Sequence, residues 1–157
     1  MKRIGFLGLN KLSESIVKAI YRTVPETQVF LYPSDCSNVQ KLAKAYPCWT
    51  LNDCQSVSEE SEIIIFSTPL CDLKAFSEKL KFCNVRTLVS LSPEVSIKQL
   101  RLLFPYSDCV RMAIISREEN DSPIAVLTGN NPEVERFLCQ IEFGYIIKDE
   151  NDINFKN

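Results

Sequence analysis

The ten residues IGFLGLNKLS, at positions 4–13, decide the fold of this chain. They begin with an apolar run at 4–7, which meets Gly8 and is followed by residues with helical periodicity. Beyond the turn, apolar side chains recur every three or four residues: Leu12, Ile16, Ala19 and Ile20. This spacing places them on one face of a helix. The stretch therefore predicts a strand, a turn at Gly8 and an amphipathic helix.

A turn between a buried strand and a helix is the place where many α/β proteins bind the pyrophosphate of a dinucleotide. Its fingerprint, G-x-G-x-x-G/A, has a glycine where the backbone approaches the phosphates and a small residue where helix and strand touch. Here the three positions are Gly8, Asn10 and Ser13. Ser13 is small, and Asn tolerates positive φ, so we expect the turn to form. The Asn10 side chain, however, would occupy space that the pyrophosphate needs.

The rest of the chain alternates apolar runs with amphipathic segments. Apolar runs that predict strands lie at residues 29–32, 63–66, 87–91, 109–115, 124–127 and 145–147, whereas the brief segment at 48–51 predicts neither a strand nor a helix. Helical spacing predicts helices at residues 39–46, 73–80, 97–104 and 132–141, with a short helix at 52–60. The continuous run at 63–66 is typical of a strand covered on both faces. We therefore predict an α/β, Rossmann-like fold: a doubly wound, mostly parallel sheet with helices on both faces.

Length and composition predict one globular unit. A chain of 157 residues can bury a core without disulfides or metal ions. We find no internal repeat, low-complexity segment or Gly/Ser-rich linker that would mark a domain boundary. We therefore expect a single dinucleotide-binding-type domain over residues 1–150 and a polar tail over residues 151–157.

Charge and cysteine usage argue against several classes of partner. The net charge is −2 and there is no long basic run, so we expect no nucleic-acid partner. The seven cysteines are scattered, without a C-x-x-C pair, and histidine is absent, so no metal site is predicted. Reduced thiols suit a cytoplasmic protein. The first apolar run ends at Leu9, too short for a signal peptide or a membrane span, so no membrane partner is expected.

Several segments also carry a family resemblance: IGFLGLNKLSESIVKAI (4–20), SEIIIFSTPLCDL (61–73), LVSLSPEVSIKQL (88–100), DCVRMAI (108–114) and FGYIIKDE (143–150). In their order and spacing, they resemble segments of the N-terminal domain of the pyrroline-5-carboxylate reductase family, NAD(P)H-dependent enzymes that make proline. The resemblance covers roughly residues 2–150. It implies a Rossmann-type fold with NADP or NAD as cofactor.

The resemblance also implies cofactor contacts at the strand ends. The residues that match the cofactor-binding positions are Gly8, Leu9, Asn10, Lys11, Leu12, Ser34, Ser67 and Thr68. The first five would meet the pyrophosphate, while Ser34 would meet a ribose or a 2′-phosphate. No catalytic residue is assigned, because hydride transfer needs little from the protein except placement of the cofactor.

The chain departs from the family pattern at several of these places. Asn10 replaces the middle glycine, Pro33 stands where the family has a polar residue for the ribose, and Glu94 adds a carboxylate to a bare turn. The family's Met-Pro-Asn-Thr-Pro turn aligns with residues 113–117, which retain none of it. The family's C-terminal helical dimerisation domain has no counterpart in the 157 residues. We therefore expect that this chain by itself is not a complete proline-forming enzyme.

Two hypotheses remain open. In the first, the chain is an NAD(P)-binding domain that acts as an oxidoreductase or as its cofactor-binding half. In the second, it is a non-catalytic, degenerate relative that acts as a protein-interaction or regulatory module, with a protein partner or a second copy of itself. The first hypothesis is favoured by the fold and by Gly8, Ser13, Ser67 and Thr68. The second is favoured by Asn10, Pro33, residues 113–117 and the lack of a counterpart to the dimerisation domain.

A few other side chains could carry chemistry. Cys71, expected at a helix N-terminus, is the cysteine best placed for a lowered pKa, against the alternative of an inert thiol. Asp72 and Glu94 could share a site, although solvated loop carboxylates, with Asp72 as a helix cap, are favoured. Arg111 and Arg117 could meet a cofactor phosphate, although an ion pair with a neighbouring acid is favoured.

Overall fold

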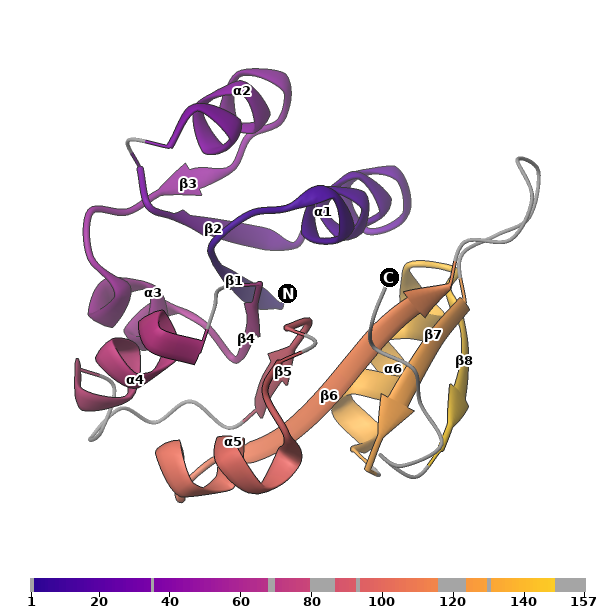
Figure 1. Ribbon diagram of the computed structural model, residues 1–157. Helices are drawn as coiled ribbons and strands as arrows, with labels where there is room; N and C mark the ends of the chain where they lie inside the picture. Colours follow the sequence, from indigo (N-terminus) through magenta and orange to yellow (C-terminus); the bar gives the residue numbers. More distant parts are fainter. Residues whose placement is uncertain are drawn as a thin grey trace.

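One mixed sheet organises the chain. The computed structural model describes residues 2–34, 36–67, 70–79, 87–92, 94–115, 124–129 and 131–148. Within them, eight strands form a sheet of order β3-β2-β1-β4-β5-β6-β7-β8 (Figure 1). Neighbouring strands are parallel except β6 and β7, which are antiparallel. Because the order runs outward from β1 and β4 in both directions, the sheet is doubly wound, which confirms the predicted Rossmann-like fold.

The predicted elements are present with small changes in their bounds. The strands are β1 (Arg3–Leu7), β2 (Gln28–Tyr32), β3 (Trp49–Thr50), β4 (Ile63–Phe66), β5 (Thr87–Ser90), β6 (Asp108–Ile115), β7 (Ile124–Thr128) and β8 (Gly144–Ile147). The helices are α1 (Lys11–Thr23), α2 (Ser37–Ala45), α3 (Cys54–Glu60), α4 (Leu70–Lys79), α5 (Ile97–Leu103) and α6 (Pro132–Gln140). The predicted tail, 151–157, lies outside the described residues.

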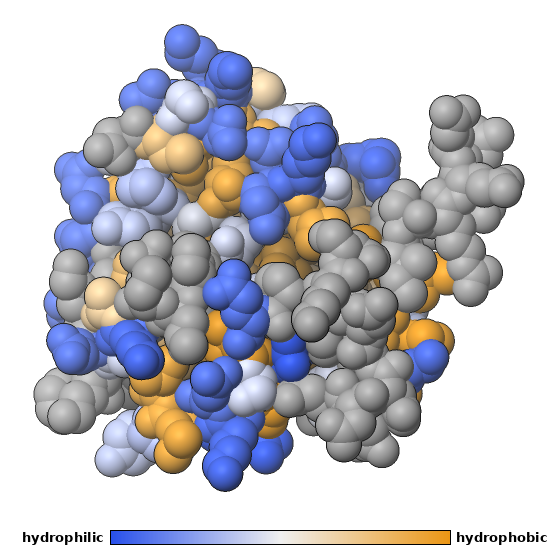
Figure 2. Space-filling model, in the orientation of Figure 1, coloured by the Kyte–Doolittle hydropathy of each residue, from blue (hydrophilic) through white to orange (hydrophobic). Residues whose placement is uncertain are grey.

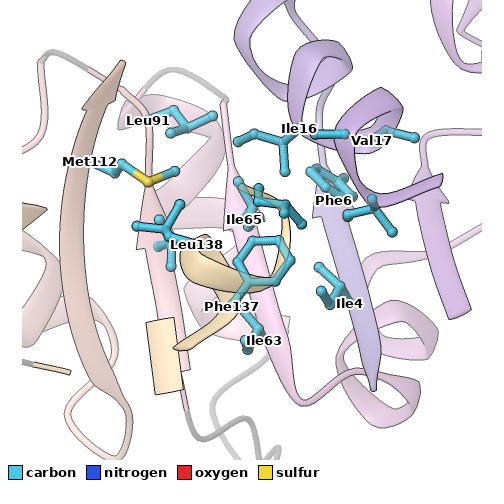
Figure 3. Packing of buried hydrophobic residues seen from close by; sticks show 14 of the residues in the cluster. Ile4, Phe6, Ile16, Val17, Ile63, Ile65, Leu91, Met112, Phe137 and Leu138 are labelled. Carbon is cyan, nitrogen blue, oxygen red and sulfur yellow. The ribbon is translucent and has the colours of Figure 1, made fainter. Parts of the chain in front are cut away.

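Each face of the sheet has its own core. On one face, α1, α2 and α6 pack against alternate side chains of the strands. Figure 3 shows this packing, with Ile16 of α1 and Phe137 of α6 directed toward the strand residues Phe6 and Ile63. On the other face, α3, α4 and α5 cover a second cluster. All four side chains of β4 are buried, as expected for a strand covered on both faces.

The packing of α3 on β1 requires a glycine. A Cβ atom at Gly5 would collide with the side chains of Val57 and Ser61, which belong to α3 and its C-cap. Without a side chain at this position, the helix can approach the strand directly. This close contact fixes the part of the sheet from which the Gly8 turn emerges.

No helix within the described ranges is both long and apolar enough to cross a membrane.

Candidate functional site

The predicted site lies at one edge of the sheet. Three residues are in register at the carboxyl ends of adjacent parallel strands: Tyr32 of β2, Leu7 of β1 and Phe66 of β4. The segments that follow these strands therefore start from the same edge. It is also the place where the strand order reverses, between β1 and β4. In open α/β sheets, ligands bind outside the carboxyl ends of the strands at this reversal.

The turn after β1 forms as predicted. Gly8 has φ 81°, a left-handed conformation that side chains other than glycine rarely adopt, and its N–H donates to the Tyr32 carbonyl oxygen at 2.9 Å. Leu9 and Leu12 pack partly buried against the core, and Lys11 is exposed at the first position of α1. The turn thus directs the N-terminus of a 13-residue helix toward the edge of the sheet.

Asn10 caps this helix with its own side chain. The Ser13 N–H donates to Asn10 Oδ1 at 2.9 Å, and the Asn10 N–H donates to Ser13 Oγ at 2.7 Å, a reciprocal capping box. Asn10 has φ −132°, so the positive φ that we considered for it is wrong, and Gly8 alone supplies the left-handed residue of this turn. The Asn10 amide oxygen therefore occupies a hydrogen-bonding position that the helix could offer to an anion.

The charges around the turn are mixed. The N-terminal end of a helix attracts anions, and the Lys11 ammonium adds a positive charge there. Glu14, also in the first turn of α1, adds a carboxylate that favours the helix but repels a phosphate. Ser13 is completely buried, as expected for the small residue where helix and strand touch.

The ends of β2 and β3 place two polar side chains together. Ser34 Oγ donates to Asn52 Oδ1 at 2.7 Å. Because β2 and β3 are parallel neighbours, Asn52 comes to the same edge as Ser34. Asn52 could not be identified from the sequence, since β3 has only two residues and so short a run does not reveal its pairing with β2. Pro33, between Tyr32 and Ser34, is half-buried.

Ser67 contributes a buried hydroxyl to this edge. Its N–H donates to the Leu7 carbonyl oxygen at 3.2 Å, which continues the β1–β4 pairing past the end of the strand. Its Oγ atom is buried and has no hydrogen-bond partner within the part of the chain that the structure describes. A buried hydroxyl without a partner is unfavourable, so it marks a place where a ligand could supply one. Thr68, the neighbouring predicted contact, lies outside the described residues.

The segment after β5 and the start of residues 113–117 differ from a ligand-lining turn. Glu94 is exposed, just before Ser96, whose hydroxyl caps α5. Ala113 and Ile114 belong to β6, which pairs with β7 through Ile115. The first three of these five residues are therefore strand, which explains why their side chains are apolar. Residues 116 and 117 lie outside the described residues.

The structure gives the positions of three other predicted candidates, Arg111, Cys71 and Asp72, but tests none of their proposed ligand contacts. Arg111 is only 5% exposed and is in register with Ser90 of β5 and Thr128 of β7. Its proposed contact with an acid or a phosphate stays a prediction. Cys71 and Asp72 lie in the first turn of α4, which begins at Leu70, so Asp72 is not its N-cap.

Two of the described thiols have a raised pKa. Cys36, Cys48, Cys109 and Cys139 are free cysteines. Burial raises the pKa of the Cys109 thiol to about 11, and burial also raises the pKa of Cys48. Both thiols are therefore protonated at neutral pH and are poor nucleophiles. Nor do the described residues contain a group of three or more His, Cys, Asp or Glu that could hold a metal ion.

Comparison with solved structures identifies the class of fold. Pyrroline-5-carboxylate reductase from Coxiella burnetii superimposes with TM-score 0.76 at 14% identity, covering 96% of this chain and 60% of that one. The Plasmodium falciparum pyrroline carboxylate reductase with NADP bound superimposes with TM-score 0.72 at 13% identity, covering 96% of this chain and 59% of that one. Prephenate dehydrogenase from A. aeolicus in complex with hydroxyphenyl propionate and NAD+ superimposes with TM-score 0.74 at 12% identity, covering 95% of this chain and 59% of that one.

These likenesses establish a Rossmann-type fold shared with pyrroline-5-carboxylate reductases and related dehydrogenases. The chain spans about three fifths of the length of these solved structures. No protein-family model matches the chain, and no curated protein matches its sequence. The family resemblance found in the sequence is thus confirmed at the level of the fold.

Proposed function

We propose that this chain is an NAD(P)-binding domain of the pyrroline-5-carboxylate reductase type. The observation that carries the proposal is the Gly8 turn, which joins a buried parallel strand to the N-terminus of α1 where the strand order reverses. Two of the structurally similar proteins have dinucleotides bound, NADP in one case and NAD+ in the other. The orphaned Ser67 hydroxyl at the same edge fits a bound ligand.

The residues at this edge divide among the parts of a dinucleotide. The first-turn N–H groups of Lys11 and Leu12, which the capping box does not use, would face the pyrophosphate. The pair Ser34 and Asn52 would receive the adenosine ribose or its 2′-phosphate. Ser67 would lie toward the nicotinamide half. The nicotinamide carries the hydride, so the protein need only place it.

The proposal is limited to a cofactor domain. Residues 113–117 and Glu94 do not reproduce the family's nicotinamide and substrate surfaces, so oxidoreductase activity would require groups from elsewhere. We further propose that residues 1–150 fold as one unit and that the protein is cytoplasmic, because Cys36, Cys48, Cys109 and Cys139 are free cysteines.

Binding is tested by thermal unfolding with NADPH and with NADH. A ligand at a hundred times its Kd stabilises the folded state by about 2.7 kcal/mol. For a domain of this size, this corresponds to a rise in Tm of roughly 5–10 °C. The proposal is wrong if neither nucleotide raises Tm at millimolar concentration.

A matched pair of variants locates the site. Ser67→Ala removes the buried hydroxyl at the carboxyl end of β4. Ser61→Ala removes another buried hydroxyl, just before β4 begins, that also has no hydrogen-bond partner among the described residues. Because Ser61 lies at the opposite edge of the sheet, only Ser67→Ala should weaken nucleotide binding, by about fivefold for one hydrogen bond. Equal effects of the two substitutions would move the ligand away from this edge.

A second candidate function is a non-catalytic interaction module that binds another protein or a second copy of this chain. Apolar side chains protrude at Leu102 and Tyr106, which are 74% and 83% exposed, and at Ile146 and Ile147 of β8. Figure 2 shows hydrophobic surface at α5 and beside β8 among hydrophilic residues. The same thermal titration decides between the two functions, since the absence of any shift would favour this one.

A further inference from the structure

The first turn of α1 is already occupied by an acceptor from the chain itself. Asn10 Oδ1 lies 2.9 Å from the Ser13 nitrogen, and Ser13 Oγ lies 2.7 Å from the Asn10 nitrogen. Ser13 Oγ also lies within hydrogen-bonding distance of the Asn10 carbonyl oxygen, at 3.0 Å. Because Ser13 is completely buried, the capping box is held in place from the inside of the protein.

Of the three first-turn N–H groups that a phosphate could use, those of Lys11 and Leu12 are left by the capping box, whereas Asn10 has taken that of Ser13. A phosphate oxygen and Asn10 Oδ1 cannot both occupy the acceptor position of the Ser13 N–H. The side chain has the advantage that its contact is intramolecular, so it loses no translational or rotational freedom when it forms. A diphosphate that takes all three first-turn N–H groups must therefore displace the amide and leave α1 without its cap. One that leaves the cap in place is held by the Lys11 and Leu12 N–H groups alone.

We propose that Asn10 is a built-in competitor for the diphosphate of a bound dinucleotide and that it lowers the affinity of the site. The inference rests on the proposed function and adds the residue that limits it. Glycine at position 10 would keep the helix start, since glycine is itself an acceptable N-cap, and would free the Ser13 N–H for the ligand. An aspartate would keep the cap and add a charge that repels phosphate.

The experiment compares the wild type with Asn10→Gly, Asn10→Ala and Asn10→Asp. Isothermal titration measures Kd for NADPH, for NADH and for inorganic pyrophosphate, which contains the competing group alone. We expect Asn10→Gly and Asn10→Ala to bind NADPH and pyrophosphate at least about fivefold more tightly, and Asn10→Asp at least about fivefold more weakly, each equivalent to about 1 kcal/mol. Two relieving variants are used so that a folding defect in one leaves the other informative.

Asn131→Gly is the matched control. Asn131 caps α6 in the same way, accepting from the N–H groups of Glu133 and Val134 at 3.0 and 3.1 Å. Glu133 contacts Thr87, the first residue of β5, so this cap lies at the amino-terminal edge of the sheet, away from the site. We expect Asn131→Gly to lower Tm and leave Kd unchanged.

The outcomes separate the two proposals. If the wild type binds a nucleotide and the Gly and Ala variants at position 10 bind it equally well, Asn10 is no competitor, although the proposed function stands. If no variant binds NADPH or NADH, relief of the cap does not open the site, and both the inference and the proposed function are wrong.

Discussion

At the scale of single residues, Gly8 and Asn10 divide two tasks that a nucleotide-binding turn usually gives to glycines. Gly8 supplies the left-handed backbone, whereas Asn10 is extended and caps the helix. The sequence therefore predicted that the turn would form and that Asn10 would interfere with a ligand. The turn is confirmed, and the interference stays a prediction. The hydrogen bond through which we propose that Asn10 competes, from the Ser13 N–H, could not be predicted because it depends on the rotamer of one side chain.

Gly8→Ala should affect both stability and binding. The left-handed conformation costs a residue with a Cβ roughly 1–2 kcal/mol, so Tm should fall by roughly 3–8 °C. Gly129→Ala is the control: Gly129 has φ 98°, and nothing lies within 4 Å of an added Cβ. It should cost similar stability without changing the Kd for NADPH. An equal loss of NADPH affinity in both variants would mean that binding responds only to global destabilisation.

At the scale of elements, the strands and helices could be predicted because their side chains follow the periods of 2 and 3.6 residues imposed by burial. The run at β4 and the helical pattern of α6 are examples. The two-residue β3, in contrast, is set by its pairing with β2. Such pairing leaves little trace in the local sequence, and the position of Asn52 beside Ser34 was missed for the same reason.

The contact between α3 and β1 predicts that Gly5→Ala is strongly destabilising. The added methyl group would overlap Val57 and Ser61, and overpacking of this kind costs about 1–3 kcal/mol. Gly144→Ala is the control, because its Cβ would meet only Ile124, at an ordinary distance of 3.9 Å. Urea denaturation should show a lower midpoint for Gly5→Ala and a change within about 0.5 kcal/mol for Gly144→Ala. Equal midpoints would mean that α3 can shift to make room.

At the scale of the whole molecule, the doubly wound topology was predictable from the alternation of elements, and it fixes where the strand ends meet. That is why Gly8, Ser34 and Ser67, far apart in the sequence, can be assigned to one edge from the sequence alone. What the topology cannot give is the ligand, since one fold serves many functions. The side chains at that edge carry the remaining information. Asn10 argues against a bound diphosphate because its amide takes the Ser13 N–H, whereas the buried Ser67 hydroxyl, which has no partner among the described residues, argues for a ligand.

The continuous sheet also predicts that the described chain unfolds as one unit. A single core cluster extends from Val39 of α2 to Phe143 before β8, so neither end of the sheet has a core of its own. Trp49, the only tryptophan, reports on β3 at one edge, and a fluorophore on the exposed Cys139 reports on α6 near the other. Their urea transitions should coincide with each other and with the loss of far-UV circular dichroism. Separate midpoints would show that the two halves fold independently, and a nucleotide should then stabilise only the half that contains Gly8.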